Sequence, residues 1–237
     1  MVAAKPAQNL VLLPGRLCDA RLFEHQIAQL NELASIVVGD LTRSDTFEGM
    51  ARDVLAAAPD RFTLAGLSLG GIVAFEIVRQ APERVTKLAL LDTNPGGNTQ
   101  ENWEEFEASL EMVRAHRLAE FSSKFYYPLM VHPSRRNDPD LQTLVAAMAE
   151  AVGEVAFARQ VQALKNRSDR WPDLPLIKCP TLIMCGQQDL LCPPALHVQM
   201  AAAIESSQLF LIKNCGHLAT LEQPVLVTEL LQQWLKI

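Results

Sequence analysis

The sequence predicts an α/β protein with a doubly wound sheet of about six parallel strands. Six short segments are apolar almost throughout instead of alternating, as expected for parallel strands that helices cover on both faces. Segments with helical periodicity separate most of them, and this alternation is typical of right-handed crossovers in a doubly wound sheet. The predicted strands are residues 9–13, 35–38, 61–65, 85–91, 181–185 and 209–212.

The predicted helices are recognised by apolar residues that recur on one face. In residues 22–33, Phe23, Ile27 and Leu30 share such a face. The helix that follows the third strand ends at Pro82, because proline has no N–H to donate and its ring clashes with the preceding turn. Two further helices are predicted at residues 46–57 and 225–235.

One long stretch, residues 98–153, contains no convincing strand and breaks the alternation. A helical insertion after the fourth strand would lie over the carboxyl edge of the sheet, where open α/β sheets bind their ligands. We therefore predict a core of residues 1–97 and 154–237 and a helical cap of residues 98–153, the alternative being ordinary covering helices. The two predicted cap faces consist of Trp103, Phe106, Leu110 and Val113, and of Leu141, Leu144, Val145, Met148 and Val152.

Length and composition are those of one compact domain. The chain has 237 residues, of which 49% are hydrophobic, enough for a large buried core. The net charge is −6 and the isoelectric point is about 5.4, which argues against a nucleic-acid surface and leaves no basic patch for an anionic membrane. We expect neither nucleic acid nor a membrane as partner, and a monomer or homodimer.

The cysteines and the apolar runs bear on the compartment. The five cysteines are odd in number and scattered, which suits reduced thiols, and none forms a Cys-x-x-Cys pair that would favour a zinc site. The first residues lack the apolar core of a signal peptide, and no apolar run approaches the roughly 18 residues that span a bilayer. These features predict a cytoplasmic protein without a metal site.

The segment Gly66-Leu67-Ser68-Leu69-Gly70-Gly71 carries the most chemical information in the chain. A predicted strand precedes it and a predicted helix follows it, so Ser68 lies on a tight turn with the Gly-x-Ser-x-Gly pattern of a nucleophile elbow. Glycines there let the strand and the helix approach closely. The first N–H groups of the helix would face an oxyanion formed at Ser68. The alternative is a glycine-rich turn with an incidental serine.

A serine nucleophile needs a base to take its proton, and the base needs an acceptor to hold its tautomer. Asp189 and His217 each follow a predicted strand and a glycine, so both are placed at the carboxyl edge of the sheet with Ser68. Asp92, directly after the fourth strand, is the rival acid. Asp189 could instead cap the following helix, and His217 could be a hydrogen-bonded loop histidine.

An oxyanion hole requires two N–H donors. The first is expected from Leu69, directly after the nucleophile, and the second from the loop that follows the first strand. Gly15 lets that loop turn, which makes the amide of Arg16 the predicted second donor, with Leu17 next. The Arg16 side chain could also meet an acidic group of a substrate, whereas a solvated surface arginine is the alternative.

The chain resembles the α/β-hydrolase superfamily over nearly its whole length. The resemblance rests on Leu12-Leu13-Pro14-Gly15, on the elbow, on Pro82-Glu83-Arg84-Val85, on Cys185-Gly186-Gln187-Gln188-Asp189 and on Cys215-Gly216-His217. The order Ser, Asp, His is that of this superfamily. Within the superfamily, the chain is most similar to small cytoplasmic bacterial members with a helical cap, such as carboxylesterases, enol-lactonases and carbon–carbon bond hydrolases.

This resemblance implies an α/β-hydrolase fold with Ser68 as nucleophile, His217 as base, Asp189 as orienting acid, and Arg16 and Leu69 as oxyanion donors. Two departures stand out. Many relatives have His-Gly where this chain has Pro14-Gly15, and the first antiparallel hairpin of relatives is missing, since the first recognisable strand starts near residue 9.

We therefore expect a cofactor-independent serine hydrolase that cleaves a small ester, thioester or lactone through an acyl-enzyme. Leu17, Phe125 and Tyr126 are the predicted substrate contacts, in a pocket for an apolar acyl or ring group. Two alternatives stay open on the same fold. One is carbon–carbon bond hydrolysis or lyase chemistry with the same triad, and the other is a non-catalytic ligand receptor.

Overall fold

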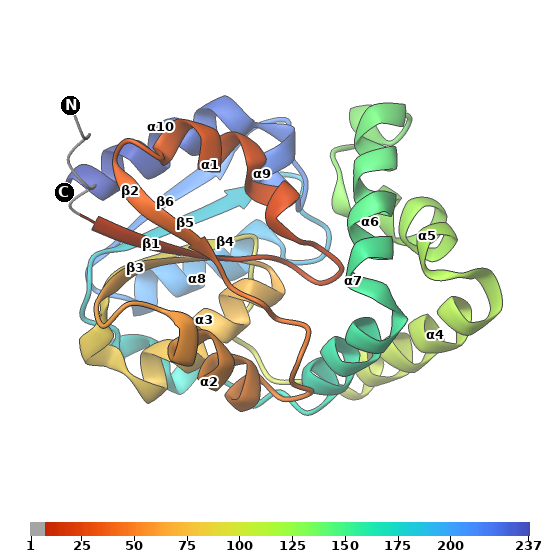
Figure 1. The fold of residues 1–237 in the computed structure, drawn as a ribbon, viewed down its shortest axis with the longest axis horizontal. Helices are drawn as coiled ribbons and strands as arrows, with labels where there is room; N and C mark the ends of the chain where they lie inside the picture. Colours follow the sequence, from red (N-terminus) through yellow and green to blue (C-terminus); the bar gives the residue numbers. More distant parts are fainter. Residues whose placement is uncertain (1–7) are drawn as a thin grey trace.

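Strands and helices alternate in the computed structural model, which describes residues 8–237. Six strands form one sheet in the order β2-β1-β3-β4-β5-β6, and every pairing between neighbours is parallel (Figure 1). The predicted doubly wound sheet is confirmed, and the described residues include no antiparallel strand. The strands are β1 Gln8–Leu13, β2 Ala34–Val38, β3 Phe62–Leu67, β4 Val85–Leu91, β5 Thr181–Gly186 and β6 Ser207–Ile212.

The burial of a strand decides how well the sequence predicts its boundaries. Every residue of β3 and of β5 is buried, since helices cover both faces and strands flank both edges. The edge strand β6 is half exposed, and it begins at Ser207 instead of at residue 209 as predicted. Its first two residues are polar and give no apolar signal, but Ser207 pairs with Thr181 of β5.

Helices cover the two faces of the sheet. In Figure 1, α1 and α10 lie above the sheet and α2, α3 and α8 lie below it. The predicted helix at 22–33 is shorter than expected, because Ala20–Phe23 forms a 3-10 turn (η1) capped by the Asp19 side chain. The covering helices are α1 Glu24–Leu30, α2 Phe47–Ala57, α3 Leu69–Gln80, α8 Pro194–Ala203 and α10 Pro224–Lys236.

A group of helices between β4 and β5 lies beside the carboxyl ends of the strands (Figure 1). Their buried apolar side chains belong to the same continuous cluster as the sheet core. The last of them runs through residue 153, where Gly153 kinks it with a φ of 81°, so the division of the chain into core and cap stays a prediction. These elements are α4 Gln100–His116, α5 Leu118–Glu120, the π-helix η3 Phe121–Tyr126, α6 Tyr127–Met130 and α7 Pro139–Lys165.

Helix α7 is the one helix of residues 8–237 that has the length and apolar composition of a membrane-spanning helix. Such a helix is weak evidence for a membrane protein, because core helices of globular proteins pass the same test. Met148, Phe157 and Val161 of α7 are fully buried in the common core, and the kink at Gly153 divides the helix into two shorter pieces. That the protein has no membrane partner stays a prediction.

Candidate active site

Ser68 stands in a strained conformation between β3 and α3. Its φ is 56° and its ψ is −116°, and residues other than glycine rarely adopt a positive φ. Two hydrogen bonds hold the turn: Ser68 N donates to Leu91 O at 2.9 Å, and Thr93 Oγ1 donates to Ser68 O at 2.7 Å. The elbow predicted from the glycine pattern is therefore present, and β4 and the loop after it support it.

Glycine is required next to this serine because two backbones meet there. A Cβ atom on Gly70 would lie 2.1 Å from the carbonyl oxygen of Leu13, at the end of β1. A Cβ on Gly66 would lie 2.4 Å from the carbonyl oxygen of Gly70. Because real Cβ atoms do not approach backbone so closely, the first turn of α3 reaches this depth only with glycines.

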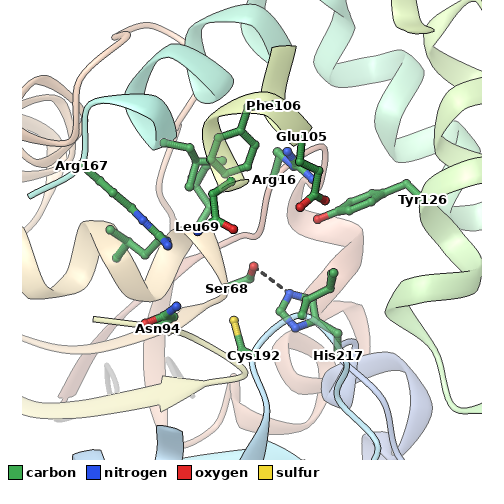
Figure 2. A pocket seen from close by; sticks show the side chains of 14 residues that line it. Arg16, Ser68, Leu69, Asn94, Glu105, Phe106, Tyr126, Arg167, Cys192 and His217 are labelled. Carbon is green, nitrogen blue, oxygen red and sulfur yellow. Dashed lines mark hydrogen bonds between the residues drawn. The ribbon is translucent and has the colours of Figure 1, made fainter. Parts of the chain in front are cut away.

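The structure brings the three predicted catalytic residues together. Ser68 Oγ lies 2.8 Å from His217 Nε2, as the dashed line in Figure 2 marks, and His217 Nδ1 lies 2.8 Å from Asp189 Oδ2. The second oxygen of Asp189 accepts the amides of Leu191 and Cys192 at 2.8 and 2.9 Å. The carboxylate thus caps its own turn and also faces the imidazole, so that Nδ1 donates to Asp189 and Nε2 accepts from Ser68.

The loops that carry Asp189 and His217 touch each other through glycine. A Cβ atom on Gly186 would lie 1.9 Å from the carbonyl oxygen of Gly216. Gln188 N also donates to Cys215 O at 2.9 Å. The distance between acid and base is therefore fixed by backbone contact between the ends of β5 and β6.

The histidine loop is tied to the end of α6 by a buried carboxylate that the sequence analysis did not predict. Glu222, at the end of α9 (Ala219–Glu222), accepts Gly216 N at 2.8 Å with one oxygen and His132 N at 2.7 Å with the other. His217 N donates to Met130 O at 2.7 Å. Burial raises the pKa of Glu222, while the two amides oppose that rise. An acidic residue five positions after the histidine was the only sequence signal for this role.

Asp92, the rival acid, has different partners. Its side chain is fully buried, and Oδ1 accepts the amide of Gly186 at 2.9 Å. Burial, followed by repulsion from Asp189, raises the pKa of Asp92 well above its usual value. Within residues 8–237, no hydrogen bond joins Asp92 to His217. The geometry favours Asp189 as the acceptor of the imidazole proton.

A second buried histidine supports the loop that follows β4. Thr93 N donates to His197 Nε2 at 3.0 Å, and His197 Nδ1 lies 3.3 Å from the carbonyl oxygen of Pro193. Burial lowers the pKa of His197 to about 4, so this imidazole is neutral near pH 7. It is a structural residue within α8.

The predicted oxyanion donors and substrate contacts have different surroundings. Arg16 and Leu69 line one cavity with Ser68 and His217, and within residues 8–237 neither backbone amide donates a hydrogen bond. The amide of Leu17, in contrast, donates to Gln160 Oε1 at 3.1 Å, and its side chain is buried outside the cavity lining.

The cavity itself has a volume of about 140 Å³ and opens to solvent. Tyr126 lines it, as predicted, and Figure 2 shows the ring at its cap side. Phe125, its neighbour on the π-helix, is 42% exposed and does not line the cavity. The lining also includes residues not predicted as substrate contacts: Ile72, Asn94, Asn102, Glu105, Phe106, Leu164, Arg167, Leu191 and Cys192.

Some of these residues carried a sequence signal and others did not. Asn94 follows β4 by three residues, so its place at the sheet edge could have been inferred in the same way as that of Asp189. Arg167 comes after α7 with no motif around it. It joins Ser68 in the cavity lining through the way the end of α7 packs against the sheet edge.

Two groups of side chains have metal-ligand chemistry. Asp189, Cys192 and His217 have ligand atoms within 4.8 Å of one another, as do Asp92, Cys185 and Asp189. Burial, then the charge of Asp189, raises the pKa of the Cys192 thiol well above its usual value, and metal binding requires the thiolate. Because Asp189 and His217 also bond to each other, these groups fit a proton-transfer site better than a metal site.

Comparison with known proteins agrees with this geometry. Residues 10–230 match the family model described as Alpha/beta hydrolase family. A candidate carbamate hydrolase named RutD, from Escherichia coli O1:K1 / APEC, is 28% identical over 174 residues, which are 72% of this chain and 64% of that protein. The match to this relative therefore spans less than two thirds of its length.

Two further relatives are esterases by name. The pimeloyl-[acyl-carrier protein] methyl ester esterase of Nitrosospira multiformis is 27% identical over 184 residues, 75% of this chain and 69% of that protein. A thermophilic esterase from Thermogutta terrifontis, solved with malate bound, superposes with a TM-score of 0.90 and 29% identity, covering 98% of this chain and 90% of the other.

Proposed function

The chain belongs to the alpha/beta hydrolase family, and from this membership we propose that it is a serine hydrolase acting on a small ester, thioester or lactone. One observation carries the proposal. The oxygen of Ser68, the imidazole of His217 and the carboxylate of Asp189 form a continuous hydrogen-bonded chain with both links at 2.8 Å. This arrangement matches the geometry of nucleophile, base and orienting acid.

The proposed reaction uses only groups of the chain. His217 Nε2 takes the proton of Ser68 as its oxygen attacks the substrate carbonyl, and Asp189 stabilises the imidazolium that results. The amides of Leu69 and Arg16 are the proposed donors to the oxyanion. Collapse of this intermediate releases the leaving group, to which His217 returns the proton, and leaves an acyl-enzyme on Ser68. Water activated by His217 then hydrolyses the acyl-enzyme.

The remaining parts of the proposal concern the setting of the enzyme. We propose that it acts in the cytoplasm, on small molecules and without a cofactor, as a monomer or a homodimer. The names of the esterase relatives support an ester substrate. Light scattering of the purified protein would establish the number of subunits.

The test is turnover of a panel of activated esters, thioesters and lactones by the wild-type chain and by Ser68→Ala. Removal of the nucleophile is expected to lower kcat by at least about 10⁴-fold, in line with other serine hydrolases. Full turnover by Ser68→Ala would contradict the mechanism. An inactive wild-type chain that still binds panel compounds would identify a ligand receptor instead.

A further inference from the structure

We propose that the substrate carries a carboxylate, which the guanidinium groups of Arg16 and Arg167 bind beside Ser68. The proposal rests on the proposed hydrolase function and names its substrate class: monoesters that retain a free carboxylate. Both arginines line the cavity that contains Ser68 and His217 (Figure 2).

Arg16 is a buried cation whose donors are not all used. The residue is 8% exposed, and its Nη1 atom is buried without a hydrogen-bond partner. The guanidinium carbon lies 4.4 Å from the ring centre of Tyr126, 5.7 Å from that of Phe106 and 5.8 Å from that of Phe157. These rings hold the planar group through its charge, and Tyr126 also forms a side-chain hydrogen bond with Arg16. Nη1 is left without a partner, so that part of the guanidinium stays available to an anion.

Arg167 is a second guanidinium with a buried donor that lacks a partner. It follows α7, and its Nε atom is buried without a hydrogen-bond partner. Burial lowers the pKa of this guanidinium, which means that its charge is poorly solvated where it lies. Among the residues that the structure describes, no carboxylate forms an ion pair with Arg16 or Arg167.

The charges around the cavity favour an anionic guest. The lining contains two guanidinium groups and one carboxylate, that of Glu105 on α4. Glu105 is exposed and therefore solvated, whereas Arg16 is buried. Leaving a buried charge without a counter-charge is unfavourable, and a ligand carboxylate would supply that counter-charge with bidentate geometry.

The sequence predicts an apolar pocket, but two guanidinium groups line the cavity. A substrate with a carboxylate accounts for this difference. The cavity opens to solvent, so a short acyl chain that ends in a carboxylate can enter it from outside. The aromatic rings of Phe106 and Tyr126 then serve to position Arg16 as well as to contact the chain.

The test compares matched esters that differ only in charge. The acyl pair is 4-nitrophenyl hydrogen glutarate and 4-nitrophenyl methyl glutarate, and the leaving-group pair is 4-acetoxybenzoate and its methyl ester. We expect the wild-type chain to prefer one anionic member in kcat/KM, and Arg167→Met and Arg16→Met to lower that anionic-to-neutral ratio by about 10- to 100-fold, the loss typical of a hydrogen bond to a charged group.

Two control variants sharpen the result. Arg52→Met removes an exposed arginine of α2 outside the cavity lining, and it should leave the ratio unchanged. Glu105→Gln removes the competing carboxylate and should raise the ratio. Circular dichroism and thermal unfolding establish that each variant is folded, and Arg167→Met, the less buried of the two arginine sites, keeps the test valid if Arg16→Met unfolds.

The outcomes separate this inference from the proposed function. If the wild-type chain hydrolyses the esters but the ratio does not respond to either arginine, the carboxylate site is wrong and the hydrolase function stands. If no ester is hydrolysed, calorimetric titration of glutarate into Ser68→Ala decides. Binding that Arg167→Met weakens at least tenfold supports the carboxylate site, and absence of binding overturns it.

Discussion

The carboxyl edge of the sheet and the cavity wall that faces it are built in different ways. Phe106 of α4, Tyr126 of η3 and Arg167 after α7 form that facing wall, which we call the cap wall. At the edge, Ser68, Asp189 and His217 each follow a strand, and backbone contacts at Gly70 and Gly186 fix their spacing. The cap wall consists of side chains from separate helices, held in place by packing. The chemistry of the site therefore depends on local sequence, whereas the choice of substrate depends on contacts between distant segments.

The largest effect on kcat/KM at the edge is expected from replacing its two buried aspartates, one at a time, by asparagine. Asp189→Asn should lower kcat/KM by about 10³- to 10⁴-fold, because the amide no longer holds the His217 tautomer. Asp92→Asn should change it by less than about tenfold, because Asn still offers an oxygen to the Gly186 amide. Initial rates with an activated ester measure both. A larger loss in Asp92→Asn than in Asp189→Asn would mean that the edge uses Asp92 as its acid.

Acid should also lower the free energy of unfolding of the protein, because His197 is buried at this edge. The folded-state pKa of about 4 is below the ordinary value of 6.5, so the unfolded chain binds the proton more readily. The free energy of unfolding is therefore unaffected by titration of His197 above pH 6.5. It decreases as the pH falls toward 4, by about 3 kcal/mol in total. Urea unfolding between pH 4 and 7 measures it, and His197→Gln should flatten the dependence. An unchanged slope in that variant would remove His197 from the explanation.

A smaller effect is expected where the two regions are joined. Glu222→Gln turns an amide NH₂ toward one of two backbone donors, Gly216 N or His132 N, so one hydrogen bond between edge and cap is lost. We expect kcat/KM to fall about tenfold, equivalent to about 1.4 kcal/mol. The exposed Glu229→Gln of α10 is the matched control. If both variants behave alike, the edge functions without this link to the cap.

The same contrast accounts for what the sequence could and could not predict. The placement of Ser68, Asp189 and His217 at one edge is predictable because a strand, a glycine and a polar residue recur there in order. Phe125 and Tyr126 could not be distinguished, because η3 is a π-helix, and its phase decides which ring faces the cavity.

Arg16 shows the same limit in a different way. Its place in the loop after β1 was predictable from Gly15. The burial of its side chain was not, because the three rings that surround it come from α4, η3 and α7.

The central claim is that His217 activates Ser68 as a nucleophile. The most direct measurement is intact-protein and peptide mass spectrometry after reaction with a fluorophosphonate. We predict one adduct on the peptide that contains Ser68, none on Ser68→Ala, and labelling of His217→Ala slowed by at least about 100-fold, within the range typical of general-base catalysis. An adduct on another residue, or equal labelling of wild type and Ser68→Ala, would contradict the claim.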